Sequence, residues 1–116
     1  MKLHKAGFEH ARALIREGKV KTAETDWSEK QPDTDKDNRF IENHGLEAWG
    51  QWHIGIRTDE DEDNKGHYAF PVGDLTRVHR SGVIAAKQRA AQNGYDDIAK
   101  AADELLELID KRRDDQ

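Results

Sequence analysis

The sequence predicts an α+β fold: a β-hairpin of two to three antiparallel strands packed against a C-terminal antiparallel helix pair, with a further helix at the N-terminus. Two β-rich stretches, 49–57 and 67–72, flank an uninterrupted acidic run at 59–63. Two stretches with helical spacing follow, separated by Asn93 and Gly94, a combination that commonly ends a helix. Strands and helices that occupy separate parts of a sequence are typical of the α+β class.

The N-terminal helix is expected over 4–16, because its apolar residues recur at intervals of three and four. These residues are Phe8, Ala11, Leu14 and Ile15. Gly18 follows as a stop signal, since glycine readily adopts the left-handed conformation that ends helices. The segment 19–36 shows no period and few apolar residues, so we expect it to be irregular or mobile. A short helix is expected next, over 37–43.

The hairpin is predicted from alternation, since successive side chains of a strand point to opposite faces of a sheet. In 49–57 the set expected to face the core is Trp52, Ile54 and Ile56. The opposite set is Trp49, Gln51, His53 and Gly55. The return strand 67–72 has an apolar face formed by Tyr68, Phe70 and Val72. Pro71 predicts that this strand lies at a sheet edge, because proline has no N–H to donate, and the polar residues 58–66 form the loop.

The C-terminal helix pair is expected over 75–92 and 97–111, with Asp74 capping the start of the first helix. The apolar stripe of the first helix is Val78, Val83, Ala86 and Ala90. The stripe of the second is Ile98, Ala101, Ala102, Leu105, Leu108 and Ile109. The alanines on both helices permit a close approach. Residues 112–116 are expected to fray.

Length and composition bound the class of molecule. The 116 residues fit a single domain over 1–116, and 34% hydrophobic against 37% charged residues permits only one compact core. The absence of cysteine excludes a thiol nucleophile, a disulfide framework and thiolate metal sites. No stretch approaches the roughly 20 apolar residues of a membrane span, and no apolar signal-peptide core is present at the N-terminus. We therefore expect a small soluble, cytoplasmic protein that does not contact a membrane.

One local group of basic residues stands out in a chain whose formal charge is −5. It consists of Arg77, His79, Arg80, Lys87 and Arg89. On a shared helical face this group could contact the phosphates of a nucleic acid. The alternative is pairing with the acidic loop or with carboxylates of the last helix, namely Asp96, Asp97, Asp103 and Glu104. We favour pairing, because the negative net charge disfavours a dedicated nucleic-acid protein.

A second candidate binding surface comes from the strand face opposite the core. Trp49 and His53 belong to that face, and together they would form an exposed aromatic patch suited to a protein partner. The first helix covering both side chains is an equally good reading. The sequence alone leaves the two alternatives open.

No arrangement of residues predicts a catalytic, metal or cofactor site. Alternating carboxylates at 33–38 and 59–64 resemble part of a calcium loop, but both segments lack the glycine at its sixth position and the glutamate at its twelfth. The six histidines form no HxH or HxxxH pair. The two serines, Ser28 and Ser81, lie outside any nucleophile-elbow context. We therefore expect no cofactor and no bound metal.

Several segments of the C-terminal half carry a resemblance to other proteins. They are Trp52-His53, His67 to Asp74, Val78 to Ser81, Ile84 to Ala90 and Ile98 to Asp110. Together they resemble a group of small uncharacterised bacterial proteins, some of them phage-associated. The resemblance covers about half of the chain and implies no activity, so it adds only that this half forms a structural unit.

The sequence thus leaves the biochemical function open and favours one class. That class is a non-catalytic binding or accessory module of a bacterial or phage-derived system, with a protein as its partner. The first alternative is a protein that contacts nucleic acid through the basic residues between Arg77 and Arg89. The second is an enzyme built on His, Asp and Glu side chains, with or without a metal.

Overall fold

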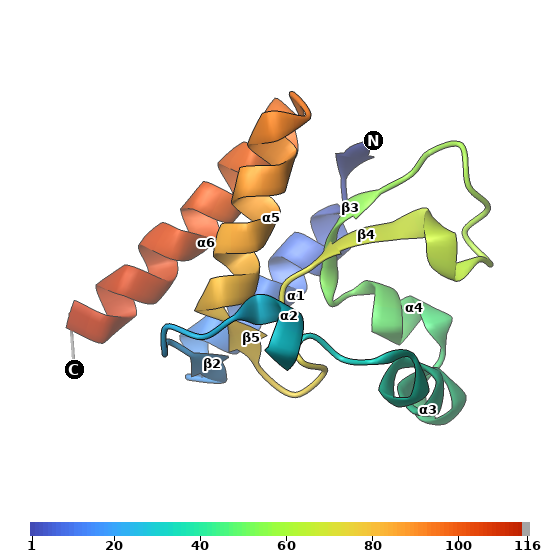
Figure 1. Cartoon of the computed structure of the whole chain (residues 1–116), viewed down its shortest axis with the longest axis horizontal. Coiled ribbons are helices and arrows are strands. Elements are labelled where there is room, and N and C mark those ends of the chain that lie inside the picture. The colour runs from blue at the N-terminus through green and yellow to red at the C-terminus, as the bar shows by residue number, and fades with distance from the viewer. Residues whose placement is uncertain (115–116) are drawn as a thin grey trace.

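The computed structural model describes the backbone of residues 1–114 and the side chains of residues 1–112, and it confirms the α+β class. The elements in chain order are β1 (Lys2–Leu3), α1 (Lys5–Arg16), β2 (Val20–Lys21), α2 (Trp27–Lys30), α3 (Thr34–His44), α4 (Leu46–Gly50), β3 (His53–Ile56), η1 (Lys65–His67), β4 (Tyr68–Pro71), β5 (Val78–His79), α5 (Arg80–Gln92) and α6 (Asp96–Asp114). Figure 1 shows the C-terminal helix pair on one side of the molecule, the hairpin on the other, and α1 between them.

The strands form two small sheets. β3 and β4 are the expected hairpin, and β1 joins β3 on its other side, which gives an antiparallel sheet in the order β1-β3-β4. Gly55 lies opposite Ala69 in this register. β4 is therefore an edge strand, as Pro71 predicted. The second sheet is a short parallel pair between β2 and β5, in which Val20 lies opposite Val78.

The hydrophobic core lies between the sheet, α1 and the helix pair. Most of the residues predicted to face the core are buried, among them Trp52, Ile54, Phe70, Val83, Ala86, Leu105 and Ile109. Ile56 and Tyr68 are only half-buried, because they form the last pair of the hairpin beside its exposed loop. The stripe of α6 is buried as expected except for Leu108, which is half-buried. Periodicity therefore identified most of the core, and its errors fall at the periphery.

Helix α1 is fixed on β3 by a close backbone approach at Gly7. A Cβ atom on Gly7 would lie 1.8 Å from the carbonyl oxygen of His53, so only glycine fits there. The backbone N–H of His4 donates to the carbonyl oxygen of Ile54 at 2.9 Å, and the His4 Nδ1–H donates to that of His53 at 2.9 Å. These contacts set the position of α1 across the sheet.

The predicted strand over 49–57 is too long. Its first part belongs to α4, and β3 begins only at His53. Gly45 has a φ of +92°, which ends α3 and lets the chain start again as α4. The alternation of Trp49, Gln51 and His53 was misleading, because apolar residues three apart, such as Leu46 and Trp49, also fit a helix.

The return strand departs from simple alternation at Phe70. Its φ is +62°, a left-handed conformation that is rare for a non-glycine residue. As a result Ala69 and Phe70 are both buried, although neighbours in a regular strand face opposite sides. β4 also begins at Tyr68, because His67 lies in the short 3-10 helix η1.

The first helix of the C-terminal pair is shorter than predicted, and Asp74 does not cap it. Residues 74–77 form a tight turn in which Asp74 Oδ1 accepts the backbone N–H groups of Thr76 and Arg77, at 2.9 Å and 2.7 Å. Leu75 has a φ of +72° within this turn. β5 follows and pairs with β2 before α5 begins at Arg80. Turn chemistry and strand pairing thus take precedence over the helical spacing of this segment.

Two further boundaries differ from expectation. The segment 19–36 contains β2 and α2, and α3 already begins at Thr34, where Asp33 Oδ1 accepts the Lys36 backbone N–H at 2.8 Å.

At the C-terminal end of the chain, α6 continues to Asp114 instead of ending at 111. Arg112, expected to fray, donates through Nη1 to the carbonyl oxygen of Arg16 at 3.1 Å. The rest of the expected frayed tail, 115–116, lies outside the described residues.

Candidate functional site

The basic residues predicted to share one face are divided between different surroundings. Arg80 donates through Nε and Nη2 to the two carboxylate oxygens of Asp110, at 2.9 Å and 3.2 Å. Lys87 Nζ lies 2.6 Å from Asp103 Oδ1. Both partners are on α6, so pairing with the last helix is confirmed for these two residues, although Asp110 was not among the predicted carboxylates. The hydrogen bond with Asp110 also raises the pKa of the Arg80 guanidinium.

The remaining members of the basic group lie elsewhere. Arg77 is in the turn before β5, and it does not belong to α5. His79 is 7% exposed, and its Nε2 lies 2.8 Å from Asp74 Oδ2. Burial opposes the ionisation of Asp74, but its hydrogen bonds with His79 and with the turn backbone outweigh that effect and lower its pKa. Arg89 points toward the hairpin, with its guanidinium carbon 5.9 Å from the centre of the Phe70 ring. The five basic residues therefore do not form one face, and only Arg80 and Lys87 share the side of α5 that meets α6.

Of the two alternatives for Trp49 and His53, the exposed aromatic patch is excluded. These residues are 6% and 5% exposed, and their ring centres lie 4.2 Å apart. Trp49 Nε1 donates to Asp37 Oδ1 of α3 at 3.0 Å, and Lys65 Nζ lies 5.6 Å from the centre of the Trp49 ring. Residues that contact the Trp49 ring thus come from α3 and from the end of the hairpin loop.

His53 is held in its neutral form. Its Nδ1–H donates to the carbonyl oxygen of Trp49 at 3.1 Å. Burial disfavours the charged imidazolium and lowers the pKa of His53 to about 4, against a smaller opposing effect of its hydrogen bonds with the backbone of Trp49 and Gly50. Near neutral pH the side chain therefore acts as a buried polar member of the core.

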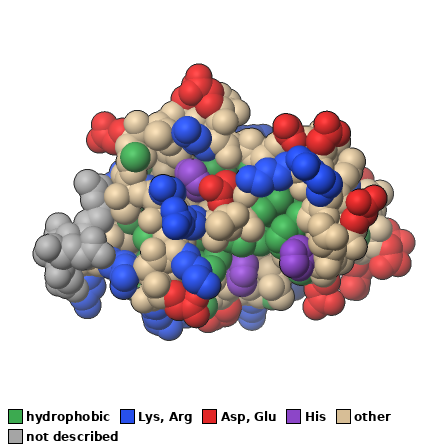
Figure 2. Space-filling model, turned by 90° about the horizontal axis from the view of Figure 1, so that it is seen from below, with side chains coloured by type: hydrophobic (Ala, Val, Ile, Leu, Met, Phe, Trp, Pro, Cys, Tyr) green, Lys and Arg blue, Asp and Glu red, His purple; other side chains and the backbone are tan. Residues whose placement is uncertain are grey.

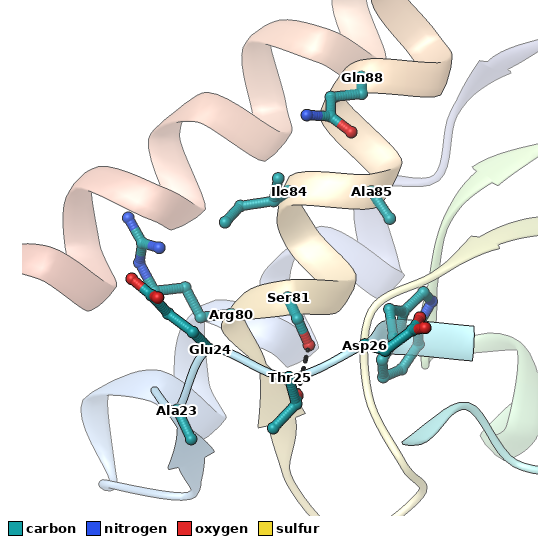
Figure 3. Close-up of a pocket in the computed structure, with 10 residues that line it drawn as sticks. Ala23, Glu24, Thr25, Asp26, Arg80, Ser81, Ile84, Ala85 and Gln88 are labelled. Atoms are coloured by element: carbon teal, nitrogen blue, oxygen red, sulfur yellow. Dashed lines mark hydrogen bonds between the residues drawn. The ribbon is translucent and has the colours of Figure 1, made fainter. Parts of the chain in front are cut away.

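Three adjoining cavities lie along α5. The first cavity, of about 390 Å³, lies between residues 23–27 and the start of α5 (Figure 3). The middle cavity, of about 300 Å³, shares Trp27 and Ala85 with it. The far cavity, of about 430 Å³, shares Phe70 and Arg89 with the middle one. Because neighbouring cavities share walls, we treat them as one channel and call it the α5 groove.

The walls of the α5 groove depend on two local features of the sequence. Ring atoms of Trp27 lie 3.1 Å from where a Cβ of Gly82 would be, so the absence of that Cβ lets α2 pack closely on α5. Asp26 holds the start of α2 by accepting the Ser28 backbone N–H at 3.0 Å. Ser81 and Ala85 lie four residues apart on one side of α5, and their small side chains leave space at the base of the first cavity. In Figure 3 the hydroxyl of Ser81 meets that of Thr25, at 3.2 Å, across the first cavity.

Charge is distributed unevenly along the α5 groove. The first cavity has Glu24 and Asp26 in its wall beside the already paired Arg80. The far cavity is lined by Arg57 and Arg89, and no Asp or Glu is among its lining residues. On the face shown in Figure 2, hydrophobic side chains are exposed between basic and acidic ones. The groove was not predicted, because its first wall belongs to the segment without periodicity; the spacing of Ser81, Ala85 and Arg89 was the only available signal.

A separate polar cavity of about 450 Å³ lies beside the hairpin loop. Its charged and titratable lining residues are His4, Glu47, Glu62, Asp63, His67 and Tyr68. Burial and the nearby carboxylates raise the pKa of Tyr68. Within the described part of the chain, no three His, Asp or Glu side chains converge closely enough to hold a metal ion.

Comparisons with known proteins place this chain beside none of them. No family model, no curated protein and no solved structure matches it. The resemblance to bacterial and phage-associated proteins therefore remains a prediction. In residues 1–114, no helix has the length and apolar character needed to cross a bilayer.

Because Arg80 and Lys87 are paired, we expect wild-type protein to pass through a phosphocellulose column at about 0.15 M salt, where screening limits weak electrostatic contacts to about 8 Å. The double variant Arg77→Glu, Arg80→Glu should behave in the same way. Retention of the wild type that is lost in the double variant, with the helical circular dichroism signal intact, would favour the nucleic-acid alternative.

Proposed function

We propose that this chain is a non-catalytic binding module that holds an extended segment of a protein partner in the α5 groove. The observation that carries the proposal is the groove itself, a run of three adjoining cavities that share lining residues along one helix. Binding sites for peptides and small ligands are concave and mostly apolar, with a few polar groups that fix orientation. The middle of the groove has that character, with Trp27, Phe70, Pro71 and Ala85 in its walls.

The surroundings of the candidate reactive groups support a binding role over catalysis. His53 is buried and hydrogen-bonded to the backbone, and His79 is buried against Asp74. Arg80 and Lys87 are engaged by carboxylates of α6. Each of these side chains thus has a structural partner and supports the local fold. Their positions offer little for substrate chemistry and leave the groove as the best candidate for recognition.

Nucleic-acid binding remains the second candidate function. Arg77 and Arg89 are exposed, and both could reach phosphates. The pairing of Arg80 and Lys87 and the net charge of −5 argue against it, since binding to the phosphate backbone depends on several free cations acting together. Membership of a bacterial or phage-derived system is part of the proposal and rests on the resemblance alone.

The test places a large side chain in the groove and identifies the proteins that no longer bind. Ala85 lines both the first and the middle cavity, so the side chain of Ala85→Arg should occupy the space meant for the partner segment. Ala91→Arg is the matched control, because Ala91 is an exposed residue of the same helix and lines none of the three cavities. Tagged wild type and both variants are used to capture proteins from the source cells, and bound proteins are identified by mass spectrometry.

We expect a protein that is retained by the wild type and by Ala91→Arg but lost with Ala85→Arg. Direct titration of that protein by calorimetry should show an affinity loss of about tenfold or more for Ala85→Arg, because overlap with an added side chain costs at least about 1.4 kcal/mol. If all three forms retain the same proteins with equal affinity, the groove is not the binding surface. Thermal unfolding of each variant separates loss of binding from loss of the fold.

A further inference from the structure

The far cavity has a charge opposite to that of the molecule as a whole. The chain carries a formal charge of −5, with 24 acidic residues against 19 Lys and Arg. Yet the cavity between β4 and the end of α5 is lined by Arg57 and Arg89 without any carboxylate. In a chain with this excess of acidic residues, a carboxylate-free cavity with two arginines favours an anionic occupant.

Arg89 is positioned to meet such an occupant at the junction of the middle and far cavities, both of which it lines. Its guanidinium lies over the Phe70 ring, which in turn packs edge-on against Tyr95 at 6.2 Å between ring centres. None of the salt bridges within residues 1–112 involves Arg89. A guanidinium that is supported by an aromatic ring and has no acidic partner keeps its donor fork available for a carboxylate.

Arg57 occupies another part of the same cavity. Its Nη1 donates to the carbonyl oxygen of Gly66 at 2.9 Å, which fixes the side chain across the end of the hairpin. The positive charge itself remains uncompensated by these contacts, because carbonyl oxygens are neutral. Arg57 and Arg89 therefore come from different elements and both contribute positive potential to one cavity.

The acidic loop favours a small anionic group over a polyanion. Residues 59–63 are all acidic, are exposed, and begin two residues after Arg57 in the sequence. Their repulsion acts over about 8–10 Å at physiological salt, so a strand of phosphates that extends beyond the cavity is disfavoured. A single carboxylate seated between Arg57 and Arg89 is the better match.

We propose that the far cavity binds the carboxylate of an acidic side chain in the partner segment, while an apolar side chain of the same segment occupies the middle cavity. This inference rests on the proposed function and adds the chemistry of the partner. The middle cavity, with walls of Trp27, Pro71 and Ala86, takes the apolar group. Arg89, which lines both cavities, binds the carboxylate of the acidic side chain.

The experiment uses two acetylated, amidated tripeptides, leucine-glycine-glutamate and leucine-glycine-glutamine, titrated into the full-length ¹⁵N-labelled protein. Backbone amide signals of Phe70 and Ala85 and the Nε–H signal of Arg89 report on binding. The variants are Arg89→Gln and, as a matched control with the same loss of charge, Arg77→Gln, since Arg77 lines neither cavity. Acetate supplies the carboxylate alone, and inorganic phosphate supplies a free anion.

The glutamate peptide should bind the wild type about tenfold more tightly than the glutamine peptide, because a charge-assisted hydrogen bond replaces a neutral one. That preference should persist in Arg77→Gln and disappear in Arg89→Gln. Acetate and phosphate should shift the Arg89 signal only weakly and leave Ala85 unchanged. If either ion reproduces the full effect of the peptide, the cavity binds a free anion and the proposed segment is wrong.

Equal binding of the two peptides, or binding of neither, would overturn the acidic preference. The proposed function is judged separately by the protein captured through Ala85. If that protein is found while both peptides bind equally, the groove remains the docking site and only the preference for an acidic side chain is rejected. If the glutamate peptide binds as expected but no protein depends on Ala85, the cavity binds carboxylates and the module proposal fails.

Discussion

Replacement of Leu105 by alanine is expected to lower the free energy of unfolding by about 2–5 kcal/mol. The Leu105 side chain is completely buried on α6, where it belongs to the core shared with α1 and α5. Truncation removes apolar contacts and leaves a cavity that the surrounding helices fill only in part. Urea unfolding followed by circular dichroism measures the loss.

The neighbouring substitution Leu106→Ala is the control for this prediction. Leu106 is half-buried at the margin of the core, so the same change of side chain should cost clearly less there. Equal losses for the two variants, or a Leu105→Ala protein as stable as the wild type, would contradict the position of α6 in the fold.

Lowering the pH from 7 to 4.5 is expected to destabilise the protein through His53. The pKa of this imidazole is 6.5 in an unfolded chain and about 4 in the folded protein. Between these two values the unfolded state binds a proton that the folded state excludes, so the free energy of unfolding falls as the pH falls from about 6.5 to about 4. The difference in pKa corresponds to a total loss of about 3 kcal/mol.

Urea unfolding at several pH values above 4.5 measures this slope. His53→Gln should be less stable than the wild type at pH 7 but should depend less on pH, because the group that takes up the proton is gone. Burial also lowers the pKa of His10, so a smaller slope of the same sign should remain. The lowered pKa of Asp74 affects stability only as the pH falls below about 4 and does not enter this range. Identical slopes for the wild type and His53→Gln would show that His53 is not the buried group responsible.

Local patterns were sufficient for much of the fold. The stripes of α1 and α6 identified two helices and their buried faces, since three or more turns of regular spacing average out local exceptions. Shorter segments were harder. Trp49 was assigned to a strand because its segment alternates, but so few residues fit a helix equally well, and Trp49 lies in α4. The start of α5 was misplaced because a parallel pairing with β2, far away in the sequence, competes with helical spacing.

The candidate site could not be predicted, for a different reason. The α5 groove depends on Trp27 packing where Gly82 leaves room, and these two residues lie far apart in the sequence. The charge of the far cavity depends likewise on Arg57 and Arg89, which are far apart in the sequence and line the same cavity. The basic group was visible in the sequence, but the carboxylates that neutralise Arg80 and Lys87 became apparent only with α6 in place. Recognition surfaces of this kind are properties of tertiary packing.

The position of α1 has a consequence for how the chain folds as it is made. The first strands pair with strands much later in the sequence, Lys2 with Ile56 and Val20 with Val78, and α1 packs against both β3 and α6. Contacts between such distant residues close large loops and form slowly. Residues 1–21 leave the ribosome before β3, β5 and α6, the elements that they pack against. Folding is therefore expected to be a cooperative event that waits until α6 has been made, and the apolar face of α1 has no partner until then.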